Sequence, residues 1–285
     1  MQPIGSLCEI IDGYDALLLD LWGVVHDGDH LYSGVAETLA ELAARHIPVV
    51  FLSNAPRRAE KVQAVLDRLG VQRAWYRAII TSGDVGCRWL ESGAAPWGPR
   101  YFYVGPEKDL DVLSAQRFEK VEALGQADFV LNVGFGEDKH PVSDMLPLLR
   151  EAHRHNLPML CLNPDLEVVK HSGERHPCAG AIAVEYAKLG GAVTWFGKPY
   201  AAVYEQCMAH LPGVEKARML AVGDSLDTDI PGAQGFGIDS LLVTGGILHA
   251  MGLAAVAEEC AARGLSPRYV SRGFIWQPVT RAAAQ

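Results

Sequence analysis

Polar residues that can do chemistry follow apolar, strand-like runs at four widely separated points of the sequence. They are Asp20, Ser53 with Asn54, Lys198 just before a helix, and Asp224. In an open parallel sheet the carboxyl ends of all strands face one edge, which is where such sheets bind their ligands. We therefore expect these side chains to converge on one site.

The residue types at these strand ends suit a phosphate group held together with magnesium. Carboxylates hold a hard cation, while a lysine and a hydroxyl bind phosphate oxygens. One carboxylate can also attack phosphorus and form an aspartyl-phosphate. The pattern alone leaves an ordinary alternative open, because Asp, Ser and Asn are also favoured in turns that simply end strands.

Alternating strands and helices are predicted to position these residues. The apolar runs Ala16–Leu19 and Ile47–Leu52 are typical of strands buried on both faces. An amphipathic helix is predicted after each run, the first capped by Ser33 and the second ended by Gly70. This rhythm favours a parallel sheet covered by helices.

The middle of the chain is predicted to be a separate α/β unit inserted into the first one. The segment ESGAAPWGP, residues 91–99, is typical of a linker, and a second strand–helix series follows it. The first rhythm resumes at the strand-like run Val193–Phe196. We place the core at residues 1–82 and 192–285, and the inserted unit at residues 83–191.

Composition and charge exclude several classes of protein. The chain has 285 residues, 49% of them apolar, and no apolar run reaches the roughly 18 residues that span a bilayer. A formal charge of −9 argues against a nucleic-acid or acidic-membrane surface, since such surfaces need clustered Lys and Arg. Six scattered cysteines without a CxxC pair indicate reduced thiols rather than a zinc site. The N-terminus has no secretion signal, so we expect a cytoplasmic protein.

Four motifs in order resemble the haloacid dehalogenase (HAD) superfamily of aspartate-nucleophile phosphohydrolases. They are DLWGVVHDG around Asp20, FLSNAP around Ser53, GKP around Lys198 and GDSLDTDI around Asp224. The inserted block, with LNPD at Leu162–Asp165 and CAGA at Cys178–Ala181, resembles the type IIA cap of the nitrophenyl phosphatase and N-acetylglucosamine phosphate phosphatase branch. The resemblance implies an α/β fold with a Rossmann-like parallel-sheet core and an inserted α/β cap domain.

The resemblance assigns a role to each motif residue. Asp20 aligns with the nucleophile, Ser53 with the phosphate-binding hydroxyl, and Asn54 with a polar residue that faces the substrate. Lys198 aligns with the lysine that balances the charge of nucleophile and phosphate. The implied Mg²⁺ ligands are Asp20, the backbone carbonyl of Trp22, Asp224 and Asp229, and the implied substrate-facing residues of the cap are Asn163, Asp165 and residues 171–176.

Trp22 departs from the family pattern. The phosphatases of the family read Asp-x-Asp in the first motif, and their second carboxylate protonates the leaving oxygen and then activates water. Here the motif reads Asp20-Leu21-Trp22. Indole has no acid or base function near neutral pH, so catalysis typically worth about 10²–10⁴-fold is lost unless another group supplies it.

Three explanations of Trp22 compete. His26 or Asp27 in the adjacent loop could act as the acid–base of a working phosphatase. Alternatively, the site binds a phosphorylated ligand and turns it over poorly or not at all. The third explanation is the dehalogenase branch, which has an aromatic residue at this position; those enzymes act without metal, whereas the GDSLDTD motif is intact here.

The predicted function is therefore a magnesium-dependent hydrolase of a small phosphate monoester, such as a sugar phosphate, acting through an aspartyl-phosphate at Asp20. The expected partner is a small phosphorylated metabolite, with neither nucleic acid nor membrane. Caps of this type offer a dimerising surface, so the resemblance also implies a homodimer.

Overall fold

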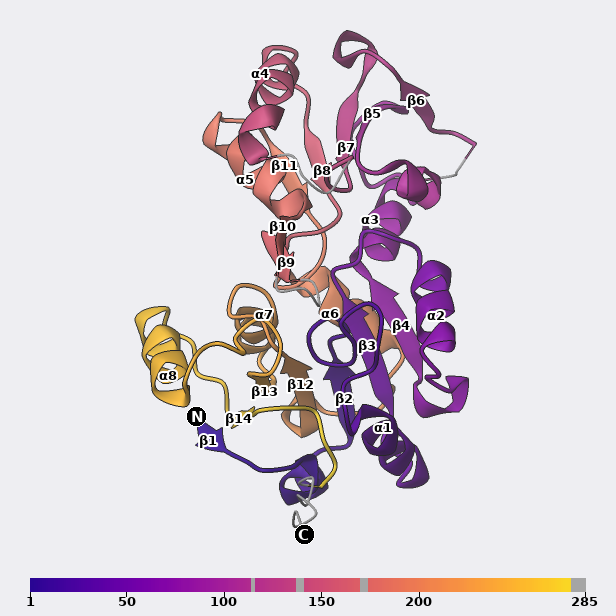
Figure 1. Cartoon of the computed structure of the whole chain (residues 1–285). Coiled ribbons are helices and arrows are strands. Elements are labelled where there is room, and N and C mark those ends of the chain that lie inside the picture. Colours follow the sequence, from indigo (N-terminus) through magenta and orange to yellow (C-terminus); the bar gives the residue numbers. More distant parts are fainter. Residues whose placement is uncertain (114–115, 137–140, 170–173, 278–285) are drawn as a thin grey trace. The chain divides into compact units, whose positions relative to one another are not determined.

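The computed structural model describes residues 1–113, 116–136, 141–169 and 174–277 of the chain (Figure 1). Its residues group into two compact units. The first comprises residues 1–52, 63–79 and 204–285, and the second comprises residues 53–62 and 80–203. The domain boundaries drawn from the sequence, at residues 82/83 and 191/192, stay predictions. Within the described residues, the structure has no helix whose length and apolar character would let it cross a bilayer.

A seven-stranded sheet forms the core, as judged from the described residues (Figure 1). In order across the sheet its strands are β1 (Gln2–Pro3), β14 (Tyr269–Ser271), β13 (Asp239–Val243), β12 (Met219–Gly223), β2 (Ala16–Leu19), β3 (Val49–Ser53) and β4 (Ala78–Thr81). The pairs from β1 through β3 are all parallel. Strand β2 lies between β12 and β3, and its four side chains are buried, as an unbroken apolar run requires. The predicted parallel α/β core is confirmed.

The helices predicted after the two apolar runs and after Lys198 are present, as α1 (Val35–Ala44), α2 (Ala59–Arg68) and α6 (Ala201–Ala209). Two further helices are α7 (Asp229–Phe236) and α8 (Leu253–Ala262). Helix α7 packs on β12 and β13. The predicted Ser33 cap is wrong, because α1 begins after Gly34, whose φ of 85° lies in the left-handed region that glycine tolerates best.

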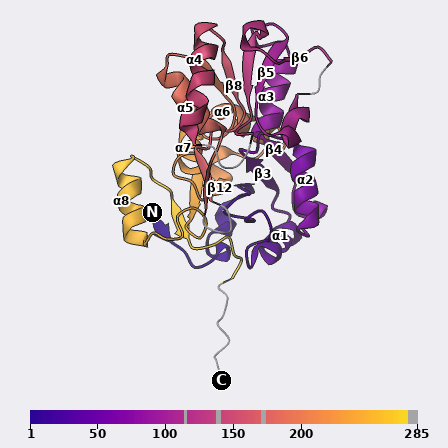
Figure 2. The ribbon, with the colours of Figure 1, turned by 45° about the horizontal axis from the view of Figure 1, so that its top comes forward.

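The second sheet is the expected inserted one, and among the described residues it has five strands. In order they are β11 (Val193–Trp195), β8 (Met159–Cys161), β7 (Phe129–Asn132), β5 (Arg100–Val104) and β6 (Glu119–Val121), all parallel. Helix α5 (Ala179–Lys188) packs on β8, and α4 (Leu146–Arg154) packs on α5 (Figure 2). A short antiparallel pair, β9 (Glu167–Val169) and β10 (Arg175–Pro177), lies between the LNPD and CAGA motifs.

The strand β11 does not resume the core sheet as expected. Val193 to Trp195 pair instead with Met159 to Cys161 of β8, at the edge of the five-stranded sheet. A short apolar run indicates a strand, but its pattern does not tell which sheet the strand joins. Sheet membership is decided by long-range pairing.

Helix α3 (Ser82–Glu91) was not predicted from the sequence. Thr81 is its N-cap, and the Thr81 hydroxyl accepts a hydrogen bond from the backbone N–H of Asp84 at 3.0 Å. Thr is a favoured N-cap residue, because its hydroxyl satisfies a backbone N–H of the first turn. The sequence Thr81-Ser82-Gly83-Asp84 therefore held a usable signal for this helix.

Candidate active site

Asp20 and Asp224 lie at the carboxyl ends of two adjacent parallel strands. Strand β2 pairs with β12 so that Leu19 faces Val222, and the backbone N–H of Asp20 donates to the carbonyl of Val222 at 2.9 Å. This register brings both carboxylates to the same edge of the core sheet. The convergence expected from strand ends is thus present for these two residues.

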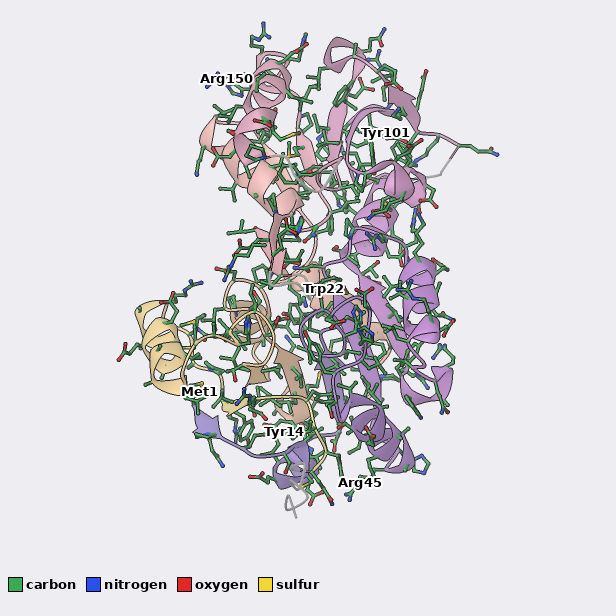
Figure 3. All side chains as sticks on the ribbon, in the orientation of Figure 1. Met1, Tyr14, Trp22, Arg45, Tyr101 and Arg150 are labelled. Atoms are coloured by element: carbon green, nitrogen blue, oxygen red, sulfur yellow. The ribbon has the colours of Figure 1, made fainter. Side chains whose placement is uncertain are left out.

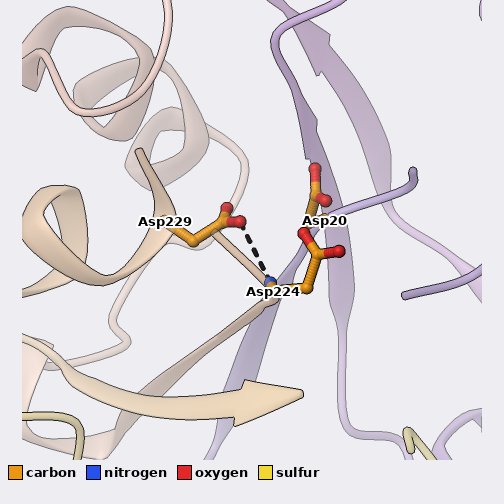
Figure 4. Close-up of side chains that lie close together, drawn as sticks. All are labelled: Asp20, Asp224 and Asp229. Carbon is orange, nitrogen blue, oxygen red and sulfur yellow. Dashed lines mark hydrogen bonds between the residues drawn. The ribbon is translucent and has the colours of Figure 1, made fainter. Parts of the chain in front are cut away.

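Asp229 completes a buried cluster of three carboxylates (Figure 4). One oxygen from each of Asp20, Asp224 and Asp229 lies within 4.8 Å of the other two. All three residues are at least nine-tenths buried. Buried like charges at this separation repel one another, so the cluster is far more stable with a cation among them.

Two glycines make room for the Asp224 carboxylate. A Cβ atom added to Gly23 or to Gly246 would lie 2.0 Å from Asp224 Oδ2. The backbone N–H of Ile247 donates to that same oxygen at 2.8 Å. Gly23 also has φ of 86°, which side chains rarely adopt. The sequence reasoning missed both glycines, because the need for glycine at these positions arises from the packing of Asp224 against them.

Asp229 also organises the loop that precedes it. Its Oδ2 atom accepts hydrogen bonds from the backbone N–H groups of Asp224 and Ser225, both at 3.1 Å, and the first of these is the dashed line of Figure 4. Asp229 is the first residue of α7, where a negative charge is favoured by the helix dipole. The carboxylate therefore holds the Asp224 backbone in place, whatever its second oxygen binds.

The donor set of this cluster fits Mg²⁺. It consists of carboxylate oxygens, which hard cations prefer, and includes no thiolate or imidazole that would favour zinc. Its charge and burial also match a small cation that offsets several carboxylates. That Asp20, Asp224, Asp229 and the carbonyl of Trp22 hold the ion stays a prediction.

Trp22 lies in the loop that follows β2 (Figure 3). Its indole packs on Gly28, where an added Cβ would come within 2.8 Å of the ring. The imidazole of His26 meets the indole edge to face, with the ring centroids 5.8 Å apart. The side chain at this position is therefore part of a packed aromatic contact inside the loop.

His26 and Asp27, the two alternative acid–base candidates, are both engaged within the same loop. His26 is buried, and its Nδ1 accepts a hydrogen bond from the backbone N–H of Gly28 at 3.0 Å. Burial lowers the pKa of His26 to about 4, so the ring is neutral at pH 7. Asp27 Oδ1 accepts the backbone N–H groups of Asp29 and His30 at 3.0 and 2.8 Å, which closes a turn.

Lys198 and Asn54 are connected by a set of hydrogen bonds in the second unit. The Asn54 Oδ1 atom accepts the backbone N–H of Lys198 at 2.6 Å, and Asn54 Nδ2 donates to the Lys198 carbonyl at 3.1 Å. Asn54 Nδ2 also donates to Asp165 Oδ1 at 2.8 Å. Both residues are buried. Asn54 thus uses both amide hydrogens to join the Lys198 loop to the loop of Asp165.

Ser53 and Asn163 support the same region through local bonds. The Ser53 hydroxyl accepts the backbone N–H of Ala55 at 3.2 Å, and Asn163 Oδ1 accepts the backbone N–H of Asp165 at 2.9 Å. Of the predicted cap segment 171–176, residues 171–173 lie outside the described residues. His176 is buried in β10, with Nε2 3.3 Å from Glu174.

The structure therefore brings the predicted site residues together in two groups. Asp20, Asp224 and Asp229 form one group in the first unit, whereas Asn54, Lys198 and Asp165 form the other in the second unit. Their catalytic, phosphate-binding and metal-binding roles stay predictions.

Comparison with known proteins gives a consistent assignment. Residues 17–119 match a family model described as haloacid dehalogenase-like hydrolase, and residues 195–270 match a second one described as HAD-hydrolase-like. A haloacid dehalogenase-like family hydrolase from Brucella suis has a solved structure that is 30% identical, with a TM-score of 0.85, covering 95% of this chain and 100% of that one.

Two further relatives are phosphatases of small metabolites by name. An acid sugar phosphatase of Staphylococcus saprophyticus is 24% identical over 258 residues, which is 90% of this chain and 93% of that protein. A glycerol phosphate phosphatase from Mycobacterium tuberculosis, solved in complex with magnesium, is 26% identical with a TM-score of 0.69, covering 94% of this chain and 76% of that one.

Proposed function

The chain belongs to the haloacid dehalogenase-like hydrolase family, and on that premise we propose that it is a magnesium-dependent phosphohydrolase acting on a small phosphate monoester, such as a sugar phosphate. Within the family we place it in the type IIA, nitrophenyl phosphatase-like branch. The observation that carries the proposal is the buried cluster of Asp20, Asp224 and Asp229 at the end of two central strands. The activities of two relatives, a sugar phosphatase and a glycerol phosphate phosphatase, support the same substrate class.

In the proposed reaction Asp20 is the nucleophile. A carboxylate oxygen of Asp20 attacks phosphorus, the bond from phosphorus to the ester oxygen breaks, and an aspartyl-phosphate forms. Water then attacks this phosphoryl group, releasing inorganic phosphate and restoring the carboxylate. Mg²⁺ bound by Asp20, Asp224, Asp229 and the Trp22 carbonyl would offset the negative charge of carboxylates and phosphate.

The second group of residues is assigned to substrate binding. Lys198 and Ser53, with main-chain amides of the first loop, hold the phosphate oxygens in this proposal, and Lys198 balances the charge of the reacting groups. Asn163 and Asp165 contribute the part of the cap that faces the substrate. Asn54 supports both through its hydrogen bonds to Lys198 and Asp165.

The proposal is tested by assaying the purified protein with Mg²⁺ against a broad panel of phosphate esters. We expect phosphate release that stops when Mg²⁺ is chelated, and no release from Asp20→Asn, since an amide is not a nucleophile of comparable strength. The Asp20→Asn protein should keep its circular dichroism spectrum. Phosphate release by Asp20→Asn at the rate of the unchanged protein would reject Asp20 as the nucleophile.

A phospho-ligand-binding protein with little or no turnover is the second candidate. Trp22 favours it, because His26 and Asp27, which could replace the missing carboxylate, are both hydrogen-bonded within their own loop. This candidate predicts no hydrolysis across the panel, together with a melting temperature raised by inorganic phosphate. That combination would replace the enzyme proposal.

A further inference from the structure

At Trp22, the loop after Asp20 has no side chain that could donate a proton to a leaving group. Trp22, two residues beyond Asp20, has an indole N–H that neither gives nor takes a proton near neutral pH. The indole packs on Gly28 and against the ring of His26. It therefore fills the space that a side chain at position 28 would need.

The two other proton-carrying side chains of this loop that stand closest to Trp22 in sequence take part in its folding. His26 is 6% exposed, and its Nδ1 is the acceptor for the Gly28 N–H. Asp27 Oδ1 is the acceptor for two backbone N–H groups, those of Asp29 and His30. Both side chains therefore hold the fold of the loop, His26 through Nδ1 and Asp27 through Oδ1.

From this arrangement we propose that the protein acts on phosphoryl compounds whose leaving oxygen departs as a stable anion: monoesters of acidic hydroxyls, such as phenols and enols, and mixed anhydrides with carboxylic acids. The inference rests on the phosphohydrolase function proposed above, and it replaces sugar phosphates with these compounds as the preferred substrates. Esters of ordinary alcohols, including sugars, bind but are cleaved slowly.

The chemical reason lies in the basicity of the leaving group. As the bond from Asp20 to phosphorus forms, the bond from phosphorus to the ester oxygen breaks, and that oxygen keeps the electron pair. An alkoxide is about as basic as hydroxide and needs a proton as it leaves. Phenols and carboxylic acids have pKa values of about 10 and about 4, so phenolates and carboxylates leave without taking up a proton.

The second step is affected in the same way. Water must attack the phosphoryl group on Asp20, forming a new bond from phosphorus to oxygen, breaking the bond to Asp20 and passing its proton to solvent. Without a positioned base this hydrolysis is slow. Its rate is the same for every substrate, because the leaving group has already gone. Phosphorylated Asp20 therefore accumulates with substrates whose first step is fast.

The test compares leaving groups at constant pH and saturating Mg²⁺. Substituted phenyl phosphates, acetyl phosphate and glycerol phosphate are assayed with the unchanged protein, Trp22→Asp and Trp22→Asn. We expect kcat/KM of the unchanged protein to fall steeply with leaving-group basicity, with glycerol phosphate at least about 10²-fold below the phenyl esters, the least that a general acid is usually worth. Trp22→Asp should narrow this gap, whereas Trp22→Asn, which removes the indole without adding an acid, should not.

A second readout needs no substitution of Trp22. After acid quenching during turnover of a phenyl phosphate, the intact mass of the unchanged protein should show one added phosphoryl group, absent from Asp20→Asn. The inference is overturned if kcat/KM of the unchanged protein depends on leaving-group basicity as weakly as that of Trp22→Asp, or if glycerol phosphate is cleaved as fast as the phenyl esters. Either result leaves the phosphohydrolase function standing. No hydrolysis and no phosphorylation with any compound overturns both.

Discussion

At the scale of single residues, the cluster of three carboxylates depends on the fit of Asp224. Asp224 Oδ2 accepts the N–H of Ile247, and Gly23 and Gly246 allow the backbone to come close to it. The contact leaves no room for a side chain at either glycine. The charge of Asp224 and the space left by the two glycines therefore contribute separately to the cluster. Substitutions at Asp224 and at Gly23 test them one at a time.

Asp224→Asn tests the charge. Removing one of three clustered carboxylates should weaken Mg²⁺ binding, because the amide offers the ion a weaker ligand and no charge. Mg²⁺ at about 100 times its Kd stabilises a folded protein by about 2.7 kcal/mol, so we expect it to raise the melting temperature of the unchanged protein and not that of Asp224→Asn.

The matched control is Asp227→Asn, three residues away. The Asp227 side chain is 58% exposed and pairs with Arg263, so its loss should leave the Mg²⁺-dependent shift intact. An equal Mg²⁺ shift in Asp224→Asn and the unchanged protein would remove Asp224 from the set of ligands.

Gly23→Ala tests the space. Gly23 and Gly70 share φ of 86°, but an added Cβ meets Asp224 at Gly23 and nothing within 4 Å at Gly70. Gly70→Ala should therefore show backbone strain alone, about 1 kcal/mol, while Gly23→Ala should lose about 1–3 kcal/mol more and lose the Mg²⁺ shift. Urea unfolding with and without Mg²⁺ measures both effects. Equal behaviour of the two variants would show that the Asp224 contact does not matter.

At the scale of elements, side chains at the ends of strands connect loops that are far apart in sequence. Asn54 follows β3, yet its amide bonds both to the backbone of Lys198 and to the carboxylate of Asp165. Asp229 at the start of α7 does the same locally for the loop after β12. These bonds position loops within each unit. Removing one of them should therefore destabilise the loops that it connects as well as the substituted residue.

Asn54→Ala and Asn54→Asp test this connection as a pair. The alanine variant loses all three bonds of the buried Asn54 amide, which should cost about 1–3 kcal/mol of unfolding free energy. The aspartate variant keeps an acceptor for the Lys198 N–H but loses the donor and places a carboxylate against Asp165. We therefore expect Asn54→Asp to be at least as unstable as Asn54→Ala in thermal unfolding. A markedly more stable Asn54→Asp would mean that the bond to Asp165 contributes little.

At the scale of the whole molecule, two compact units each have their own sheet and apolar core. The three clustered carboxylates all belong to the first unit, whereas the second unit has a separate core around β7, β8 and α5. Ligands of different kinds are therefore expected to stabilise different units, Mg²⁺ the first and the organic part of the substrate the second.

Hydrogen–deuterium exchange on the whole chain tests this division. Mg²⁺ alone should slow exchange at residues 19–23, 223–230 and 245–247, which surround the carboxylates, because local opening must release the ion. Exchange in β7 and β8 should stay the same. Protection that appears first in β7 and β8 would place the cation in the second unit.

Much of the core and part of the site could be predicted from the sequence. The apolar runs of β2 and β12 ended at Asp20 and near Asp224, and parallel pairing is enough to bring such ends together. Gly23 and Gly246 could not be identified as necessary, because the need for glycine arises only when Asp224 packs against them. The partners of Asn54 were equally hidden, since they lie 111 and 144 positions away.

The sequence by itself determined the α/β class and the strand ends that carry Asp20 and Asp224, because these follow from local pattern and residue type. Tertiary structure decided the rest. It assigned Val193–Trp195 to the five-stranded sheet, gathered three carboxylates within 4.8 Å, and engaged His26 and Asp27 inside their own loop. Each of these depends on contacts between atoms that local pattern does not specify, since packing and hydrogen bonding select one partner among many chemically equivalent ones.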